Sequence, residues 1–317
     1  MEKIKTFGSY LKSKYGVRVK KIPLAIGGFT CPNIDGTVAK GGCTFCLNDS
    51  FSPNVAKNKD KIFLNLNSKE NPLINNQLNQ VVSQINKSKL EFKPLGYKKY
   101  LAYFQAFTNT YAPFDTLKKL YSKALSQKDI IGLSIGTRSD SVQDCVLEYL
   151  SELSKDYEIW IEFGIQSVYD ETLKKINRGH DAKNIEVAIK KAKDYGLNVC
   201  GHLIFGLPGE NQEMMLHSAK TAFEWGIDSV KFHPLYVVKN TILANEYNRG
   251  EFTPINLNDY LDTLVKAIDI MPKDIIVQRV TAGIDDDTLL APSWCGESKN
   301  YLMGRIKKEL KKAGYTY

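Results

Sequence analysis

Short β-rich runs alternate with longer segments of helical period, and this alternation restricts the fold more than any other feature of the sequence. The candidate strands are residues 22–28, 100–107, 130–136, 159–166, 198–206 and 229–236. Each is followed by a segment that can form a helix, which is the pattern of βα units around a parallel sheet. Right-handed crossovers would wrap these units into one curved sheet.

Polar residues at the ends of the predicted strands decide between two α/β architectures. They recur on every strand, as if converging on one mouth, which favours a partial (β/α)6 TIM-like barrel over a doubly wound open sheet. We expect the barrel to span residues 22–240, after a basic N-terminal segment of residues 1–21. Residues 241–317 would form a C-terminal extension with a short strand at 275–280 and a basic final helix near 297–313.

Period-two alternation assigns the faces of these strands, because residues i, i+2 and i+4 line the same side. One face is polar and carries Tyr103, Gln105, Phe107, Ser134, Gly136, Arg138, Glu162, Gly164, Gln166, His202, Ile204 and Gly206, with Lys231 and His233 added by the sixth strand. The opposite face is apolar and suits packing against outer helices. A polar interior is costly unless its groups find partners, so it is more often a binding cavity than a core.

Three of the six cysteines crowd into sixteen residues directly after the first predicted strand. Cys31, Cys43 and Cys46 would therefore lie on a loop at the carboxyl end of the sheet. A chain of 317 residues with so few cysteines is not a disulfide scaffold, so metal binding is the better interpretation of this group.

The number of ligands then separates two kinds of metal site. A closed zinc site needs four protein ligands, and no fourth Cys or His lies nearby, since the first histidine is His180. Three thiolates leave one position open, which suits a [4Fe-4S] cluster whose remaining iron binds a small molecule. Zinc with a remote fourth ligand and a chance grouping are the alternatives.

The cysteine loop on the first of six βα units resembles that of the radical S-adenosylmethionine (radical SAM) superfamily. Its spacing, eleven residues between Cys31 and Cys43 and two before Cys46, is similar to the branch of the Elongator catalytic subunit and oxygen-independent coproporphyrinogen oxidase. The whole chain resembles a bacterial family in that branch through CPNIDG at 31–36, GCTFC at 42–46, YFQAFTNTYAP at 103–113, NRGH at 177–180 and GLPGE at 206–210.

The resemblance implies a [4Fe-4S] cluster held by Cys31, Cys43 and Cys46, with S-adenosyl-L-methionine (SAM) on the open iron. In such enzymes the reduced cluster cleaves SAM to a 5′-deoxyadenosyl radical, which takes hydrogen from the substrate. The cofactor-binding residues that we predict are Gln105, Ser134, Glu162, Gln166, Arg178 and His202.

The predicted cofactor contacts differ in how well they match the resemblance. Gln166 and Arg178 resemble the pair that holds SAM in relatives, whereas Gln105 stands where relatives place a glycine-rich turn. His202 stands where relatives carry an Asp facing the ribose, and Glu162 would supply a missing carboxylate. The alternative for each is a satisfied interior group. Lys231 and His233 match no cofactor role, so we predict that they face the substrate as catalytic groups; shaping a loop is the alternative.

Lys and Arg number 43 against 35 Asp and Glu, and the net charge of +8 favours a polyanionic partner. A lysine-rich compositional bias is the other explanation. With the Elongator resemblance, the charge predicts a tRNA-modifying enzyme acting on the C5 side chain of wobble uridine, supplied with electrons by a partner such as flavodoxin or ferredoxin. The alternatives are a radical SAM enzyme acting on a small metabolite or tetrapyrrole, and a non-catalytic RNA- or zinc-binding module.

Membrane insertion and export are not expected from the sequence. Nowhere do 18 apolar residues run uninterrupted, and residues 1–21 lack the apolar region of a signal peptide. We therefore predict a cytoplasmic protein.

Overall fold

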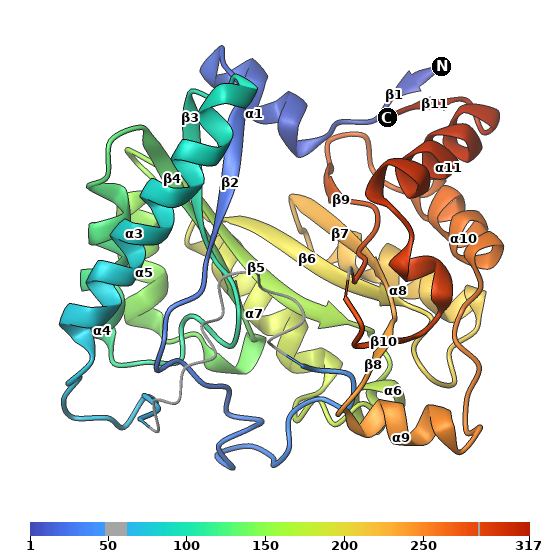
Figure 1. Cartoon of the computed structure of the whole chain (residues 1–317), viewed down its shortest axis with the longest axis horizontal. Coiled ribbons are helices and arrows are strands. Elements are labelled where there is room, and N and C mark those ends of the chain that lie inside the picture. Colours follow the sequence, from blue (N-terminus) through green and yellow to red (C-terminus); the bar gives the residue numbers. More distant parts are fainter. Residues whose placement is uncertain (48–61, 285) are drawn as a thin grey trace.

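The computed structural model describes residues 1–47, 62–284 and 286–317. Its centre is a parallel sheet with the strand order β2-β3-β4-β5-β6-β7-β9. These strands are β2 (Val19–Leu24), β3 (Lys99–Phe104), β4 (Ile130–Thr137), β5 (Glu158–Gln166), β6 (Asn198–Phe205), β7 (Ser229–Pro234) and β9 (Ile276–Arg279). The sheet curls into an open half-barrel (Figure 1).

Helices cover the outer face of this half-barrel (Figure 1). They are α3 (Ile74–Phe92), α4 (Phe114–Leu125), α5 (Asp144–Leu153), α6 (Asp170–Lys175), α7 (Ala182–Asp194) and α8 (Gln212–Glu224). Phe104 of β3, for example, meets Tyr121 of α4 edge-on, with ring centroids 5.2 Å apart, and both are fully buried. The apolar outer face predicted from strand alternation is therefore the main core of the protein.

Side-chain caps fix where two of the outer helices begin. Asp181 accepts a hydrogen bond from the backbone N–H of Asn184 at the start of α7, and Asn211 does the same for Met214 at the start of α8. Such caps satisfy backbone donors that a first helical turn leaves unpaired. Gly196, at a φ of 73°, lets the chain turn from α7 into β6.

The predicted partial barrel is confirmed, with seven strands in place of six. The seventh, β9, was expected as a short strand of the C-terminal extension, and it pairs in parallel with β7 at the edge of the sheet. The first strand also lies earlier than predicted. It ends at Leu24 because the backbone N–H groups of Ala25 and Gly27 turn away to the side-chain oxygens of Gln84 and Gln80 on α3.

Helix α1 (Phe7–Tyr15) closes the amino end of the half-barrel. Phe7 and Leu11 pack in a second apolar cluster with Leu101 and Trp160, separate from the main core. The two chain ends meet nearby, where β1 (Glu2–Lys3) pairs in parallel with β11 (Tyr315–Thr316). The N-terminal segment thus covers the amino end of the barrel interior.

The remaining elements lie on the side of β9. They are β8 (Val237–Val238), α9 (Ile242–Asn248), α10 (Leu257–Asp269), β10 (Leu289–Ala291) and α11 (Lys299–Lys312), with a short 3-10 helix at Ser293–Gly296. Two further 3-10 helices, at Lys93–Leu95 and Ser139–Ser141, follow α3 and β4. Within the described residues, no helix has both the length and the apolar character needed to cross a membrane.

Candidate functional site

The cysteine loop leaves the carboxyl end of β2 and lies at the lower edge of Figure 1. Its thiols are free: Cys43 is buried, whereas Cys31 and Cys46 are partly exposed, and all three line one cavity. The side-chain amide of Asn33 fixes the loop by donating to the Cys43 sulfur at 3.6 Å and to the backbone oxygen of Asn177. Burial and the neighbouring thiols of Cys43 and Cys31 raise the pKa of Cys46. A bound metal would remove this cost, because it takes the thiolate form.

The number of thiol ligands favours a cluster over a single zinc ion. A closed zinc site has four protein ligands, and the cysteine loop brings three thiols to the cavity. Three thiolates on one loop fit a [4Fe-4S] cluster with one open iron.

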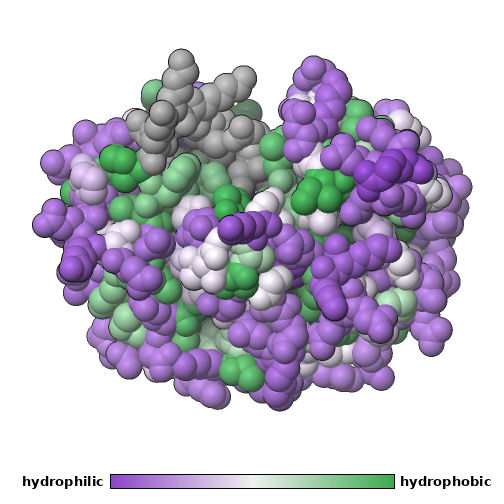
Figure 2. All heavy atoms as spheres, turned by 90° about the horizontal axis from the view of Figure 1, so that it is seen from below, coloured by the Kyte–Doolittle hydropathy of each residue, from purple (hydrophilic) through white to green (hydrophobic). Residues whose placement is uncertain are grey.

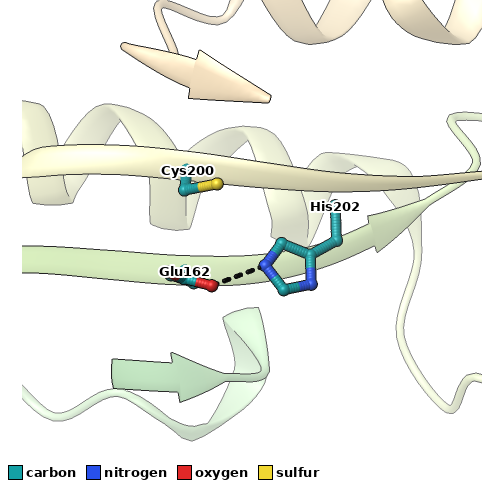
Figure 3. A group of neighbouring side chains, drawn as sticks. All are labelled: Glu162, Cys200 and His202. Carbon is teal, nitrogen blue, oxygen red and sulfur yellow. Dashed lines mark hydrogen bonds and ion pairs between the residues drawn. The ribbon is translucent and has the colours of Figure 1, made fainter. Parts of the chain in front are cut away.

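Glu162, Cys200 and His202 do not form a second metal site, although their ligand atoms converge (Figure 3). His202 Nε2 lies 2.8 Å from Glu162 Oε2, and the Cys200 thiol is buried beside them. The ammonium groups of Lys21 and Lys231 also bond to this carboxylate. Two positive charges already neutralise the carboxylate, so a cation there would meet repulsion.

Five side chains form a buried ionic network inside the half-barrel: Lys21, Ser134, Glu162, His202 and Lys231. Glu162 accepts from Lys21 and Ser134 through Oε1, and from Lys231 and His202 through Oε2. Its four acceptor positions are therefore used within the chain. The predicted contact of Glu162 with the ribose of SAM stays a prediction, and it would have to displace one of these donors.

Burial and neighbouring charge set the protonation of this network. Although burial alone would raise it, Lys21 and Lys231 hold the pKa of the Glu162 carboxyl well below its usual range. Burial lowers the pKa of Lys21 to about 8, against the attraction of Glu162. Burial and the charge of Lys231 lower the pKa of His202 to about 4, so His202 is neutral at pH 7.

Gln166 and Arg178 lie together over Gly164 of β5. Arg178 donates to the Gly164 oxygen at 2.7 Å and to the Cys43 sulfur at 3.7 Å. A Cβ on Gly164 would stand 2.6 Å from the Gln166 amide nitrogen and 2.8 Å from the Arg178 guanidinium, so the glycine leaves room for both. The buried Nε of Arg178 has no partner among the described residues. Unused donors beside the thiols suit the carboxylate of a cofactor.

Gln105 begins a turn with an unusual backbone. Ala106 and Phe107 follow it at φ values of 77° and 60°, a left-handed conformation that normally favours glycine. The side-chain amide of Asn109 holds this turn by donating to the backbone oxygens of Ala106 and Gly136, both at 3.0 Å. Relatives have a glycine-rich turn at this position. This chain has no glycine there, but Ala106 and Phe107 adopt the left-handed backbone conformation that glycine favours.

Lys231 and His233 lie on β7 and both line the cavity. The Lys231 ammonium donates to the Tyr103 hydroxyl at 3.0 Å as well as to Glu162. The ring of His233 lies 5.5 Å from that of His202, and its buried Nε2 has no partner within the described ranges. Lys231 is thus held inside the network, whereas His233 keeps a polar atom available to a bound molecule.

The cavity has a volume of about 1430 Å³. It runs from the cysteine loop past the buried ionic network to residues of β9 and α11. Pockets for one drug-sized ligand usually measure about 300–1000 Å³. The half-barrel therefore has room for a cofactor and for part of a second molecule.

Sequence interpretation missed Lys21, which belongs to the network. It was assigned to the basic N-terminal segment because the first strand was placed from residue 22 onward. In the structure β2 begins at Val19, and Lys21 points into the interior at the position two residues later. Alternation counted from the true start of the strand would have identified it.

Comparison with protein families agrees with this geometry. The model of the radical SAM superfamily matches residues 36–222, more than half of the chain, and the model of the Radical_SAM C-terminal domain matches residues 227–312. The chain belongs to the radical SAM superfamily.

Relatives of this radical SAM protein include Protein YhcC of Escherichia coli, which is 41% identical over 92% of this chain and 87% of the relative. The tRNA uridine(34) acetyltransferase of Methanocaldococcus infernus is 31% identical over 58% of this chain and 34% of its own length. The solved structure of archaeal Elp3 from the same organism matches with a TM-score of 0.61 at 21% identity, covering 93% of this chain and 63% of Elp3. The suspected Elongator-related branch is thereby supported, and the fold is confirmed.

Radical SAM proteins use a [4Fe-4S] cluster and SAM, which together supply a 5′-deoxyadenosyl radical for hydrogen abstraction. In this chain Cys31, Cys43 and Cys46 would hold the cluster. Arg178 and Gln166, beside Cys43, would orient the carboxylate end of SAM. The cavity of the half-barrel would hold both groups beside the cysteine loop.

Proposed function

We propose that this radical SAM enzyme modifies tRNA at the C5 side chain of wobble uridine. The observation that carries the proposal is the 31% identity, over 187 residues, to a tRNA uridine(34) acetyltransferase. The match covers 58% of this chain and 34% of the relative. Nucleotide 34 is the wobble position, so the proposed target follows from the relative's named substrate.

Two features of the chain support an RNA substrate. The cavity of about 1430 Å³ leaves space for a nucleotide beside SAM. The net charge of +8 attracts a polyanion, and the face seen from the side of the cysteine loop is mostly hydrophilic (Figure 2). In this proposal the enzyme works in the cytoplasm, with tRNA, and receives electrons from a flavodoxin or ferredoxin.

His233 and Lys231 have different roles in the proposed reaction. His233 offers a neutral ring nitrogen to the substrate from the cavity wall. Lys231 holds the hydroxyl of Tyr103 toward the same space, at 3.0 Å. We propose that both side chains position the modified base, while hydrogen abstraction itself belongs to the cofactor.

The test is SAM cleavage in the presence of tRNA. The protein is purified without oxygen, reconstituted with iron and sulfide, reduced, and mixed with SAM and bulk tRNA from cells that lack it. We expect 5′-deoxyadenosine to form and to rise severalfold with this tRNA. The variants Cys31→Ala, Cys43→Ala and Cys46→Ala should reduce it to background, whereas Cys145→Ala, on α5 outside the cavity, should not.

Two results would contradict the proposal. If tRNA does not change the rate of SAM cleavage, the substrate would instead be a small metabolite or tetrapyrrole. An intact cluster with bound SAM but no cleavage would remove the catalytic assignment altogether. A positive result is completed by mass analysis of the wobble nucleoside before and after incubation.

A further inference from the structure

Three cations on one side of the cavity have no carboxylate partner. Arg279 ends β9, and Lys299 and Lys307 lie on α11; all three line the cavity and are exposed. Within residues 1–47, 62–284 and 286–317, none of their side chains forms an ion pair or a hydrogen bond. We call these three residues the C-terminal rim.

Two other cations of the cavity are already paired with carboxylates. Lys231 bonds to Glu162, and Arg138 forms an ion pair with Asp140 at 2.6 Å. On the side of the C-terminal rim the described lining contributes a single carboxylate, that of Glu297. Positive charge is therefore in excess at the rim. Deeper inside, Arg178 also has no carboxylate partner among the described residues, but its guanidinium lies against the Cys43 sulfur, where the cofactor would bind.

Arg279 connects the rim to the cavity interior. It stands directly beside Lys231 in the pairing of β7 with β9. Arg279 and His233 both line the cavity, and burial together with the charge of Arg279 holds the pKa of His233 well below its usual range. A group that binds between them would meet a permanent cation and an unpaired ring nitrogen. This combination suits an anion with several oxygens.

The arrangement distinguishes a polymer from a small anion. Arg279, Lys299 and Lys307 come from two elements and lie along the wall rather than around one point. Lys299 and Lys307 are eight residues apart on α11, a rise of about 12 Å along a helix. Successive phosphates of a nucleic-acid strand are several ångströms apart, so a strand can contact cations spaced in this way.

We propose that the C-terminal rim binds the phosphodiester groups that flank the nucleotide entering the cavity. This inference rests on the proposed tRNA-modifying function and adds the surface through which the RNA is held. The rim acts on RNA affinity and does not contact the thiols of the cysteine loop.

The test compares two neighbouring lysines and then the whole rim. Lys307 lines the cavity, whereas Lys308 is equally exposed on α11 but does not. Fluorescence anisotropy with labelled tRNA should show weaker binding for Lys307→Gln and no change for Lys308→Gln. The triple variant R279Q/K299Q/K307Q should bind at least tenfold more weakly. The slope of log affinity against log salt should fall by about 2–3, near 0.7–0.9 for each lost phosphate contact.

The outcomes separate this inference from the proposed function. If tRNA binds the wild-type protein and the triple variant with equal affinity and equal salt slope, the rim assignment is overturned and the tRNA proposal stands. Equal losses in Lys307→Gln and Lys308→Gln would likewise overturn it, because they would reflect net charge alone. If the wild-type protein binds no tRNA, both fail. Iron content and thermal midpoint of each variant establish that the fold and cluster are intact.

Discussion

Glu162 holds together strands that lie far apart in the sheet. It stands on β5, in the middle, while its partners Lys21 and Lys231 come from β2 at one edge and β7 near the other. Both ion pairs therefore cross the interior of the half-barrel. Breaking a buried pair by removing one partner leaves uncompensated charge, which costs about 3–5 kcal/mol. The network thus stabilises the curved form of the sheet, and with it the arrangement of the side chains that line the cavity.

Replacing Glu162 with Gln should destabilise the fold by about 3–5 kcal/mol, because two buried ammonium groups lose their counter-ion. Urea denaturation followed by tryptophan fluorescence measures the loss. Glu152→Gln is the matched control: its partner Lys155 and Glu152 itself are 66% and 69% exposed, and such pairs contribute less than about 1 kcal/mol. Equal effects of the two substitutions would show that the network does not stabilise the interior.

Strand elements were predictable where the signal is local. Alternation placed Ser134, Glu162 and His202 on one interior face, and their mutual hydrogen bonds show that they share it. The membership of β9 in the sheet has no local signal, since its pairing with β7 joins residues 47 positions apart. The contact between Lys21 and Glu162 joins residues 141 positions apart, so the periodicity of a single strand cannot predict it either.

The turn after β3 shows a second limit of local prediction. Ala106 and Phe107 adopt left-handed backbone conformations that propensity assigns to glycine. Their conformation is imposed by tertiary contacts, above all by the Asn109 amide that bonds across to Gly136 of β4. The strand predicted over residues 100–107 was therefore too long at its carboxyl end: β3 ends at Phe104, and neither the start nor the shape of the turn followed from the alternation.

Gly164 offers a test of how β5 positions the cofactor-binding side chains. Gly164→Ala would place a Cβ against the ends of Gln166 and Arg178, both of which can move, so we expect the fold to survive. Displacing them should weaken SAM binding by about tenfold, which equilibrium dialysis with the reconstituted protein measures. Gly304→Ala, on α11 with nothing within 4 Å, is the control and should leave SAM affinity unchanged. Unchanged affinity in Gly164→Ala would separate Gln166 and Arg178 from the cofactor.

At the scale of the whole molecule, the histidines couple folding to acid. Of the four in the chain, His180, His202 and His233 have lowered pKa values, to about 3 for His180 and about 4 for His202, because burial and nearby cations disfavour their charged forms. His217 is exposed on α8. In the unfolded chain these histidines become protonated near pH 6.5, whereas in the folded chain they stay neutral at that pH. The free energy of unfolding therefore falls as the pH drops below about 6.5.

We expect the free energy of unfolding to fall by about 3–4 kcal/mol between pH 7 and pH 5.5, near 1 kcal/mol for each of the three histidines. Urea denaturation at a series of pH values measures this slope. His202→Asn should remove about a third of the slope, whatever its effect on stability at pH 7. Glu162 adds a further loss only below about pH 4.5, because its lowered pKa keeps the carboxylate charged above that range. A stability that is constant from pH 7 to pH 5.5 would mean that the three imidazoles take up protons in the folded chain as readily as in the unfolded chain.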